Sequence, residues 1–318
     1  MDRDEALRGA LLKTDRVLGK YDPLEHILAV DDFDDGQQGW APYFPDYDGR
    51  EDYVGKYEHV ESLQTILERT RAGTIDNRVD RKPPLGRRAV PQISSLPTWD
   101  VGSAGSFGSY ALKIPTLPLA GHKGIAMKRS TCRFHRKFRI ETYFTFKADP
   151  GDLRLGDTDV RAIYLTFDVH DPARVTESGR TPRRWWPGVR YHNAQDGEPV
   201  QRWQAMLRGS KGVKDGPWDY LDDGRQQLGY NRAATKFQWH YLRLTFDLER
   251  YEYVDFNCYG KEFNVRGLTH VFDPPLTGWR ASTDKAHGLV LPSFCIEADR
   301  DKRCFLYLDS VVMSASSE

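Results

Sequence analysis

From about residue 107 onward, apolar and polar side chains alternate along the chain, and this period of two most constrains the fold. In residues 137–146, for example, Phe138, Ile140, Phe144 and Phe146 fall on one side of an extended segment, and Arg139, Glu141, Tyr143 and Thr145 fall on the other. A strand places successive side chains on opposite faces, so such a segment predicts a strand with one buried face. Further strands are expected at 107–115, 124–129, 161–169, 188–194, 200–207, 237–248, 251–256, 288–297 and 304–313. About ten strands joined by turns predict an all-β, two-sheet antiparallel jelly-roll sandwich, not a helical or nucleotide-binding fold.

The first hundred residues have a different pattern. Residues 3–18 form the one segment with clear helical spacing: Leu7, Leu11 and Leu18 share a face, and Gly19 can end the helix. We therefore expect a helical arm at 1–28 and a single sandwich domain at 29–318. A long irregular insertion at about 41–98 includes a short helix at 57–71 and a loop at 81–97. The arm either packs on the body or joins copies of the chain into a homo-oligomer.

Composition excludes several classes of partner. Lys plus Arg number 46 and Asp plus Glu number 46, so the chain lacks the basic excess expected for binding nucleic acid or an anionic membrane surface. No apolar run has the length of a membrane span, and the N-terminus shows no signal peptide. The four cysteines form no CxxC pair and are expected to be reduced. These features predict a cytoplasmic protein.

The polar face of the expected strands has an unusual composition. Aromatic rings, arginines and carboxylates gather on it: Arg139, Glu141, Tyr143, Tyr164, Asp168, Trp239, Tyr241, Arg243, Tyr251, Tyr253 and Asp255. A pyranose ring stacks on an aromatic side chain, and arginine and carboxylate groups hold its hydroxyls. The face therefore predicts a carbohydrate site. The alternative is a face covered by the 41–98 segment and the N-terminal helix.

A second dense polar-aromatic segment runs from Arg190 through His192 to Trp203. Asp196-Gly197 predicts a hairpin turn, which would bring His192 close to Gln201 or Trp203. A histidine beside an arginine can act as a general base while the arginine neutralises developing charge, and a polysaccharide lyase would add a tyrosine as the acid. The alternative is ordinary pairing in a polar hairpin.

Several stretches resemble known sandwich families. Residues 31–36 (DDFDDG) with Trp40, followed by 108–114 (GSYALKI), look like the opening of concanavalin A-like and galactose-binding-like domains. Residues 239–247 (WHYLRLTFD), running through 257–261, resemble a laminin-G-like hairpin, and 305–311 (FLYLDSV) resemble the closing strand. The whole chain is similar to an uncharacterised bacterial family of unknown function. It lacks the E-x-D-x-x-E carboxylates of laminarinase-type hydrolases.

The resemblance also implies a metal site. Such sandwiches often hold a structural calcium ion between acids of the first and last strands, which here are Asp34 and Asp309 with Asp32 nearby. The alternative is a solvated acidic turn. No nucleotide or redox cofactor is expected, because the Gly-rich stretch 102–108 precedes no helix and the nine histidines show no zinc-ligand spacing.

Glycoside hydrolysis needs two carboxylates on opposite sides of a bond. Glu141, Asp168 and Asp255 are the candidates, with Glu297 as a fourth. The sequence thus predicts a carbohydrate-active protein that cleaves a small intracellular glycoside or oligosaccharide. The alternative is a non-catalytic carbohydrate-binding protein or an oligomeric scaffold.

Overall fold

The computed structural model describes residues 18–42, 93–97, 110–132, 135–148, 158–170, 184–207, 218–229, 238–268 and 288–318. Most of the predicted N-terminal helix, the expected helix at 57–71 and most of the 41–98 insertion lie outside these residues. Within the described part of the chain the one helical element is the short 3-10 helix η1 (Leu18–Lys20). None of the described helices is long and apolar enough to cross a membrane.

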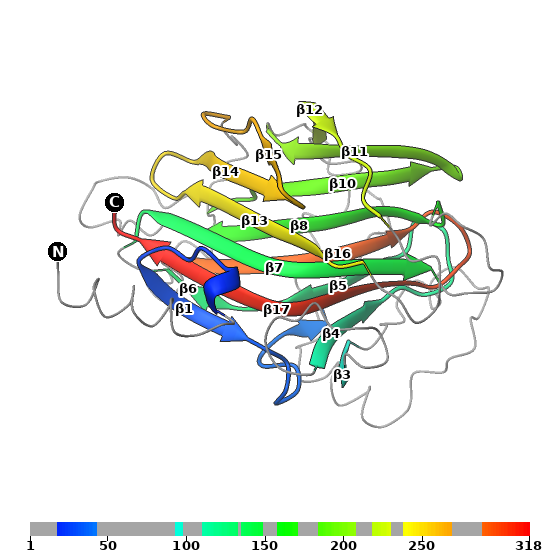
Figure 1. Cartoon of the computed structure of the whole chain (residues 1–318), viewed down its shortest axis with the longest axis horizontal. Coiled ribbons are helices and arrows are strands. Elements are labelled where there is room, and N and C mark those ends of the chain that lie inside the picture. The colour runs from blue at the N-terminus through cyan, green and yellow to red at the C-terminus, as the bar shows by residue number, and fades with distance from the viewer. Residues whose placement is uncertain are drawn as a thin grey trace, which may run out of the picture.

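The remaining described elements are strands in two sheets (Figure 1). Sheet A has the order β15 (Lys261–Phe263), β14 (Glu252–Cys258), β13 (His240–Asp247), β7 (Lys137–Ala148), β17 (Cys304–Ser316), β4 (Tyr110–Pro115) and β3 (Ser94–Pro97), with β1 (His26–Asp31) also paired to β17. Sheet B has the order β12 (Trp218–Arg225), β11 (Glu198–Met206), β10 (Gly188–Gln195), β8 (Val160–His170), β16 (Leu289–Ala298), β5 (Lys123–Met127) and β2 (Ala41–Pro42), with β6 (Ser130–Thr131) on β16 and β9 (Arg184–Trp185) on β8.

These sheets confirm the predicted all-β, two-sheet sandwich. Every strand pair in the described residues is antiparallel. Successive strands change sheet repeatedly, for example from β4 to β5, from β7 to β8 and from β16 to β17, so neighbours in a sheet are often distant in sequence. Side chains from widely separated segments therefore meet on each face.

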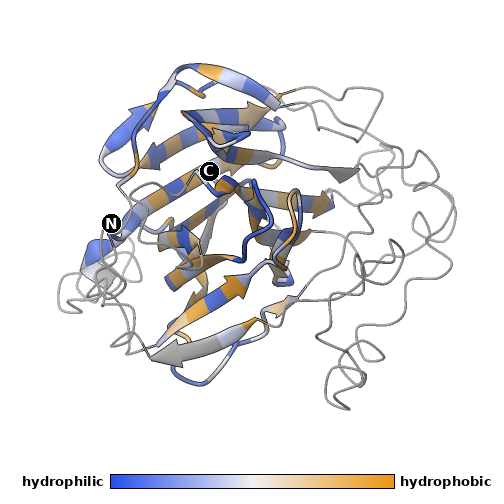
Figure 2. Cartoon of the chain, turned by 90° about the vertical axis from the view of Figure 1, so that its right-hand side faces the viewer, coloured by the Kyte–Doolittle hydropathy of each residue, from blue (hydrophilic) through white to orange (hydrophobic). Residues whose placement is uncertain are grey.

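The core fills the space between the two sheets. Phe138 of β7 and Phe246 of β13 pack against Phe167 of β8 in the opposite sheet, with ring centroids 6.0 and 4.8 Å from that ring. Figure 2 shows hydrophobic and hydrophilic residues alternating along the strands, as the period of two predicted. Apolar burial of this kind is the main favourable contribution to folding.

The first and last strands of the sandwich lie side by side. β1 pairs with β17 from His26 opposite Ala315 to Asp31 opposite Val311. Asp31 is buried and accepts hydrogen bonds from Trp40 Nε1 at 2.9 Å and Lys128 Nζ at 2.6 Å. Backbone pairing thus joins the first and last strands, and the Asp31–Lys128 ion pair ties β1 to the segment that follows β5.

Candidate functional site

The structure divides the predicted polar face among three places. Arg139, Glu141, Tyr143, Tyr241, Arg243 and Asp255 lie on the outer face of sheet A, where Trp239 packs with Phe305 and Tyr307. Tyr164 and Asp168 lie on the outer face of sheet B, on the other side of the sandwich. Tyr251 packs against the core from the β13–β14 turn. Alternation within each strand was predicted well, but a period of two does not tell which of two outer faces a strand contributes to.

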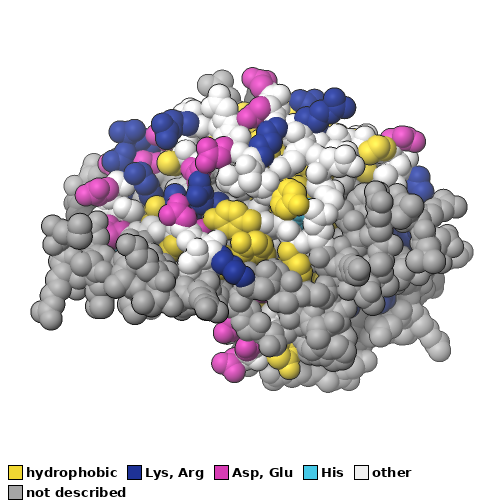
Figure 3. Space-filling model, viewed as in Figure 1, with side chains coloured by type: hydrophobic (Ala, Val, Ile, Leu, Met, Phe, Trp, Pro, Cys, Tyr) yellow, Lys and Arg dark blue, Asp and Glu magenta, His cyan; other side chains and the backbone are white. Residues whose placement is uncertain are grey.

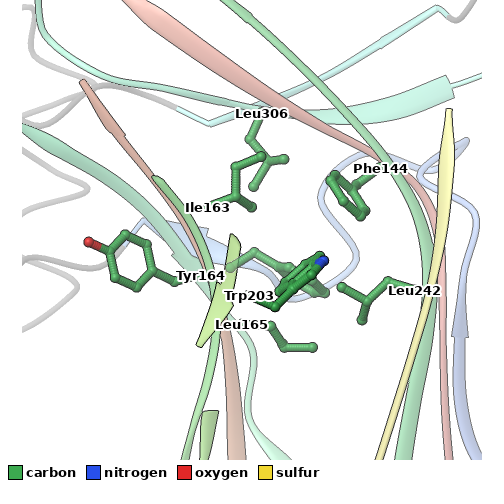
Figure 4. Close-up of a pocket in the computed structure, with 8 residues that line it drawn as sticks. Phe144, Ile163, Tyr164, Leu165, Trp203, Leu242 and Leu306 are labelled. Carbon is green, nitrogen blue, oxygen red and sulfur yellow. The ribbon is translucent and has the colours of Figure 1, made fainter. Parts of the chain in front are cut away.

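Two predicted ligand contacts are wrong, because Trp203 and Tyr253 are core residues. Each has 1% of its surface exposed. Figure 4 shows Trp203 with Ile163 and Leu165 beside a small cavity between the sheets, while the ring of Tyr164 points out on the other side of sheet B. The cavity is lined almost entirely by apolar side chains and offers no polar group to orient a sugar.

A β-bulge explains why Tyr253 changed sides. The pairing of β13 with β14 shifts between Thr245 and Phe246, so Asp255 faces outward while Tyr253 and Phe256 both face the core. A bulge inserts one residue and inverts the alternation on one side of it. The Tyr253 hydroxyl then reaches sheet B, where it accepts a hydrogen bond from Gly188 N at 2.8 Å.

The outer face of sheet A is partly covered by the segment that follows η1. Tyr21 is buried there against the rings of Tyr143 and Tyr241, with centroids 5.8 and 6.4 Å away. The Asp22 backbone N–H donates to Glu141 Oε1 at 2.7 Å. Figure 1 shows η1 lying across β7 and β17. The alternative of a covered face thus holds for this part of sheet A.

Glu141 is the most buried of the predicted catalytic acids, with no exposed surface. Its Oε1 accepts from Asp22 N and from the Tyr241 hydroxyl, whereas Oε2 is buried without a hydrogen-bond partner among the described residues. Burial raises the pKa of this carboxyl, although both hydrogen bonds and Arg139 oppose the shift. A side chain with no exposed surface cannot reach a bound substrate.

Charged groups on sheet A satisfy one another. Arg243 donates to both oxygens of Asp255, at 2.7 and 3.0 Å, and its Nη1 lies 3.1 Å from Asp22 Oδ2. Arg139 Nη1 lies 2.8 Å from the same Asp22 oxygen. Figure 3 shows Lys and Arg side chains interleaved with Asp and Glu over this face. The network fastens the N-terminal segment to the sheet.

The acids predicted to hold calcium have other contacts. Asp32 Oδ1 accepts from Gln38 Nε2 at 2.6 Å, and Asp34 Oδ1 accepts from Tyr110 N at 3.1 Å. Asp309 is buried on β17 opposite Tyr143. No group of three or more His, Cys, Asp or Glu side chains in the described part of the chain is arranged to hold a metal ion. The predicted calcium site therefore gains no support from these residues.

The outer face of sheet B presents two adjacent rows of side chains that cross neighbouring strands. The first row, in strand-pairing order, is Ile125, Cys295, Tyr164, Arg190, Gln204 and Tyr220. The second is Lys123, Glu297, Ala162, His192 and Arg202. We call these residues, together with Trp218, the sheet B site. Ala162 is the smallest side chain of the second row and lies between Glu297 and His192, beside the larger Tyr164.

Tyr164 lies at the centre of the sheet B site. Its hydroxyl donates a short hydrogen bond to Glu297 Oε2, and Lys123 Nζ lies 3.6 Å from the same carboxylate oxygen. Burial raises the pKa of Tyr164, so the phenol keeps its proton at neutral pH. Burial also opposes the charge of Lys123, but Tyr164 and Glu297 outweigh it and raise the pKa of the lysine. Tyr164 thus provides a hydrogen-bond donor, and Lys123 and Glu297 provide one positive and one negative charge beside it.

Arg190 lies against two rings of the sheet B site, those of Trp218 and Tyr164, which also contact each other at a centroid distance of 5.6 Å. Its guanidinium carbon is 5.1 Å from the centroid of Trp218 and 5.5 Å from that of Tyr164, within the range of cation–π attraction. Buried Gln204 accepts from Arg190 Nε at 2.6 Å. No carboxylate of the described residues pairs with Arg190. The two terminal nitrogens of the guanidinium, Nη1 and Nη2, therefore have no carboxylate partner in the described part of the chain.

His192 contacts a different residue from the one predicted. Asp196 and Gly197 have φ values of 54° and 84°, so the hairpin turn is confirmed. The register places His192 opposite Arg202, while Trp203 pairs with Tyr191 in the core. His192 Nδ1 is 2.8 Å from the hydroxyl of Tyr220, which is 41% exposed. Burial and Arg190 lower the pKa of His192, which favours neutral imidazole.

Sequence reasoning missed several residues of the sheet B site. The residues not proposed as ligands are Lys123, Gln204, Trp218 and Tyr220. The predicted acid Asp168 lies on the same sheet, and it accepts a hydrogen bond from Trp186 Nε1 at 3.0 Å. The pairing of β5 and β12 with the sheet comes from long-range contacts. No local motif marks those pairings.

The family model described as Domain of unknown function (DUF6772) matches residues 8–317. The chain belongs to this family. The expectation of a family of unknown function is confirmed. No curated protein matches the chain in sequence.

Among solved structures, the chain is similar to the cellulose induced protein Cip1, with 11% identity, a TM-score of 0.41 and coverage of 91% of this chain and 97% of that one. It is similar to the potassium-bound carbohydrate recognition domain of Emp46p, with 11% identity, a TM-score of 0.36 and coverage of 65% and 83%. Lectin I-B4 from Griffonia simplicifolia, in its metal-free form, gives 11% identity, a TM-score of 0.36 and coverage of 71% and 92%. These values concern backbone arrangement and carry no information about activity.

Proposed function

We propose that this DUF6772 protein binds a carbohydrate on the outer face of sheet B. The observation that carries the proposal is the cluster of partly accessible Trp218 and exposed Tyr220 beside Arg190 and Gln204, all on one face. Ring faces provide stacking surfaces for a pyranose, and fixed polar groups beside them provide hydrogen bonds to hydroxyls.

The sheet B site fits this role better than the outer face of sheet A. On sheet A the polar groups pair with one another and with the segment at Tyr21 and Asp22. On sheet B, Arg190 and Arg202 contact rings and neutral acceptors, not carboxylates, in the described residues. Unpaired cations on an aromatic surface are available to a ligand.

Binding is better supported than glycoside hydrolysis. Of the predicted carboxylates, Glu141 is fully buried and Asp255 is held by Arg243, both on sheet A. On sheet B, Glu297 lies opposite Ala162, six residues along β8 from Asp168, which is about 20 Å at the rise of a strand. Hydrolysis requires two carboxyl groups within about 10 Å. Glu297 and Asp168, the two predicted acids that lie on sheet B, do not meet this requirement.

The experiment is a calorimetric and thermal-shift screen against neutral and acidic oligosaccharides, repeated with Trp218→Ala and Trp239→Ala. Each variant removes one indole, the first from sheet B and the second from the outer face of sheet A. We expect sugar binding to be lost in Trp218→Ala and kept in Trp239→Ala, with both proteins folded by circular dichroism. The reverse result would place the site on sheet A, and no binding to any sugar would refute the proposal. Repeating the screen with calcium and with chelator tests the ion predicted at Asp32, Asp34 and Asp309.

A further inference from the structure

We infer that the sheet B site recognises an acidic sugar, and that Arg190 receives the carboxylate of a uronate residue. This inference rests on the proposed carbohydrate function and specifies its substrate class. It follows from the balance of charge across the two rows and from the way in which the Arg190 side chain is held.

The charge balance of the sheet B site is positive. Lys123, Arg190 and Arg202 bring three cations, and Glu297 brings the one carboxylate of the two rows. Glu297 is itself shared with Lys123 at 3.6 Å and Arg161 Nη1 at 3.9 Å. His192 does not add a cation at neutral pH, because burial and Arg190 lower its pKa. Counted over the residues of these two rows, an anionic sugar would compensate the positive excess and a neutral sugar would not.

Arg190 is oriented before any ligand arrives. Gln204 accepts from Nε at 2.6 Å, and the rings of Trp218 and Tyr164, which pack edge to face, both contact the guanidinium group. Nη1 makes a long contact of 3.5 Å with the Tyr164 hydroxyl, whose proton goes to Glu297, and Nη2 has no partner among the described residues. A guanidinium fixed by Nε presents Nη1 and Nη2 as a planar pair, which matches the two oxygens of a carboxylate.

The neighbouring groups suit the rest of a uronate ring. Trp218 and exposed Tyr220 lie two residues apart on edge strand β12, and Tyr220 pairs across to Gln204. The Arg202 guanidinium lies 4.5 Å from the Tyr220 ring centroid and can meet a second acidic sugar of the same chain. Lys123 belongs to β5, which lies on the other side of β8 from β10, and its Nζ is 5.1 Å from the centroid of the Tyr164 ring. Two cations on the neighbouring strands β10 and β11, with a third on β5, thus fit an oligomer that carries more than one charged sugar.

The test compares oligogalacturonate, oligoglucuronate and alginate oligomers with the methyl esters of the same oligomers. Esterification removes the charge and keeps the sugar, linkage and length. We expect at least one acid to bind about 10- to 100-fold more tightly than its ester, as a charge-assisted hydrogen-bond pair allows. Arg190→Gln should remove that preference, and added salt should weaken acid binding more than ester binding.

Arg250→Gln is the matched control, because Arg250 is an exposed arginine on the β13–β14 turn of sheet A. It should keep the preference for the acid. Esters or neutral oligomers that bind as tightly as the acids would overturn the inference while leaving the carbohydrate function in place. Preference for a sulfated oligosaccharide over every uronate would overturn it as well. If no sugar of any charge binds, both proposals fail.

Discussion

Tyr241 donates its hydroxyl proton to Glu141 Oε1 over 2.5 Å, and the backbone N–H of Asp22 donates to the same oxygen. One buried carboxyl thus joins the neighbouring strands β13 and β7 to the segment that crosses them. A residue chosen from the sequence as a catalytic acid therefore serves as an anchor for the N-terminal segment. A buried acceptor of this kind leaves two unsatisfied donors if it is removed.

The anchor should give the stability of the protein a defined pH dependence. Burial raises the pKa of Glu141 above the ordinary value of a glutamate carboxyl, so the folded state binds this proton more tightly than the unfolded chain. The stability that the buried, protonated carboxyl contributes is then lost as pH rises through its folded-state pKa, because the buried group must ionise. Glu141→Gln keeps an acceptor oxygen without the charge. We expect the unfolding free energy of the variant, relative to wild type, to be higher at about pH 8 than at about pH 5.

Denaturant unfolding at the two pH values measures this difference. Glu141→Ala is the control, because it also removes the acceptor and should be less stable than Glu141→Gln by about 1–3 kcal/mol at both pH values. An advantage of the glutamine variant that is equal at both pH values, or larger at the lower one, would contradict a raised pKa for Glu141.

Trp203 should matter for stability and not for ligand contact. It is buried against Tyr191 and Phe256, with centroids 5.1 and 4.9 Å away, so Trp203→Ala leaves a large cavity. We expect a loss of about 3–5 kcal/mol in unfolding free energy. Trp218→Ala on the outer face of the same sheet should cost about 1 kcal/mol or less. Equal losses for the two variants in chemical denaturation would place Trp218 in the core.

The stability of the protein should depend strongly on both residues of the Asp31–Lys128 ion pair. Asp31 has 5% of its side chain exposed, and Lys128 lies 2.6 Å away. Lys128→Met leaves a buried carboxylate without its cation and should cost about 3–5 kcal/mol. Adding Asp31→Asn removes the charge and keeps an oxygen for Trp40 Nε1, so the double variant should recover part of the loss. A double variant less stable than Lys128→Met alone would refute this account.

Tyr253 should act as a polar link between the two sheets. Its hydroxyl accepts from Gly188 N at 2.8 Å and lies 2.8 Å from the Met206 carbonyl oxygen. Tyr253→Phe keeps the ring and leaves these buried backbone groups unsatisfied, so we expect a loss of about 1–3 kcal/mol. Thermal unfolding and hydrogen exchange at Gly188 provide the measurement. Unchanged protection of that amide would show that the hydroxyl is not its acceptor.

The fold class and the two sides of most strands could be predicted from local residue patterns. Alternation placed Phe138, Ile140 and Phe144 in the core, and Arg139 and Glu141 outside it, because a strand repeats every two residues whatever its neighbours are. The Asp196-Gly197 turn was also predictable, since positive φ at both residues is a local requirement that this pair meets. These features depend only on short-range geometry.

Which strands share a face depends on long-range pairing and could not be predicted from local patterns. The order of strands brings Lys123, Glu297, Tyr164 and Arg190 together from segments far apart in the chain, and it sends Glu141 and Asp255 to the opposite side of the sandwich. A bulge reversed Tyr253, and the hairpin register moved Trp203 into the core. Strand order, register and bulges are set by packing between distant segments, whereas the period of two is the same in every arrangement of the strands.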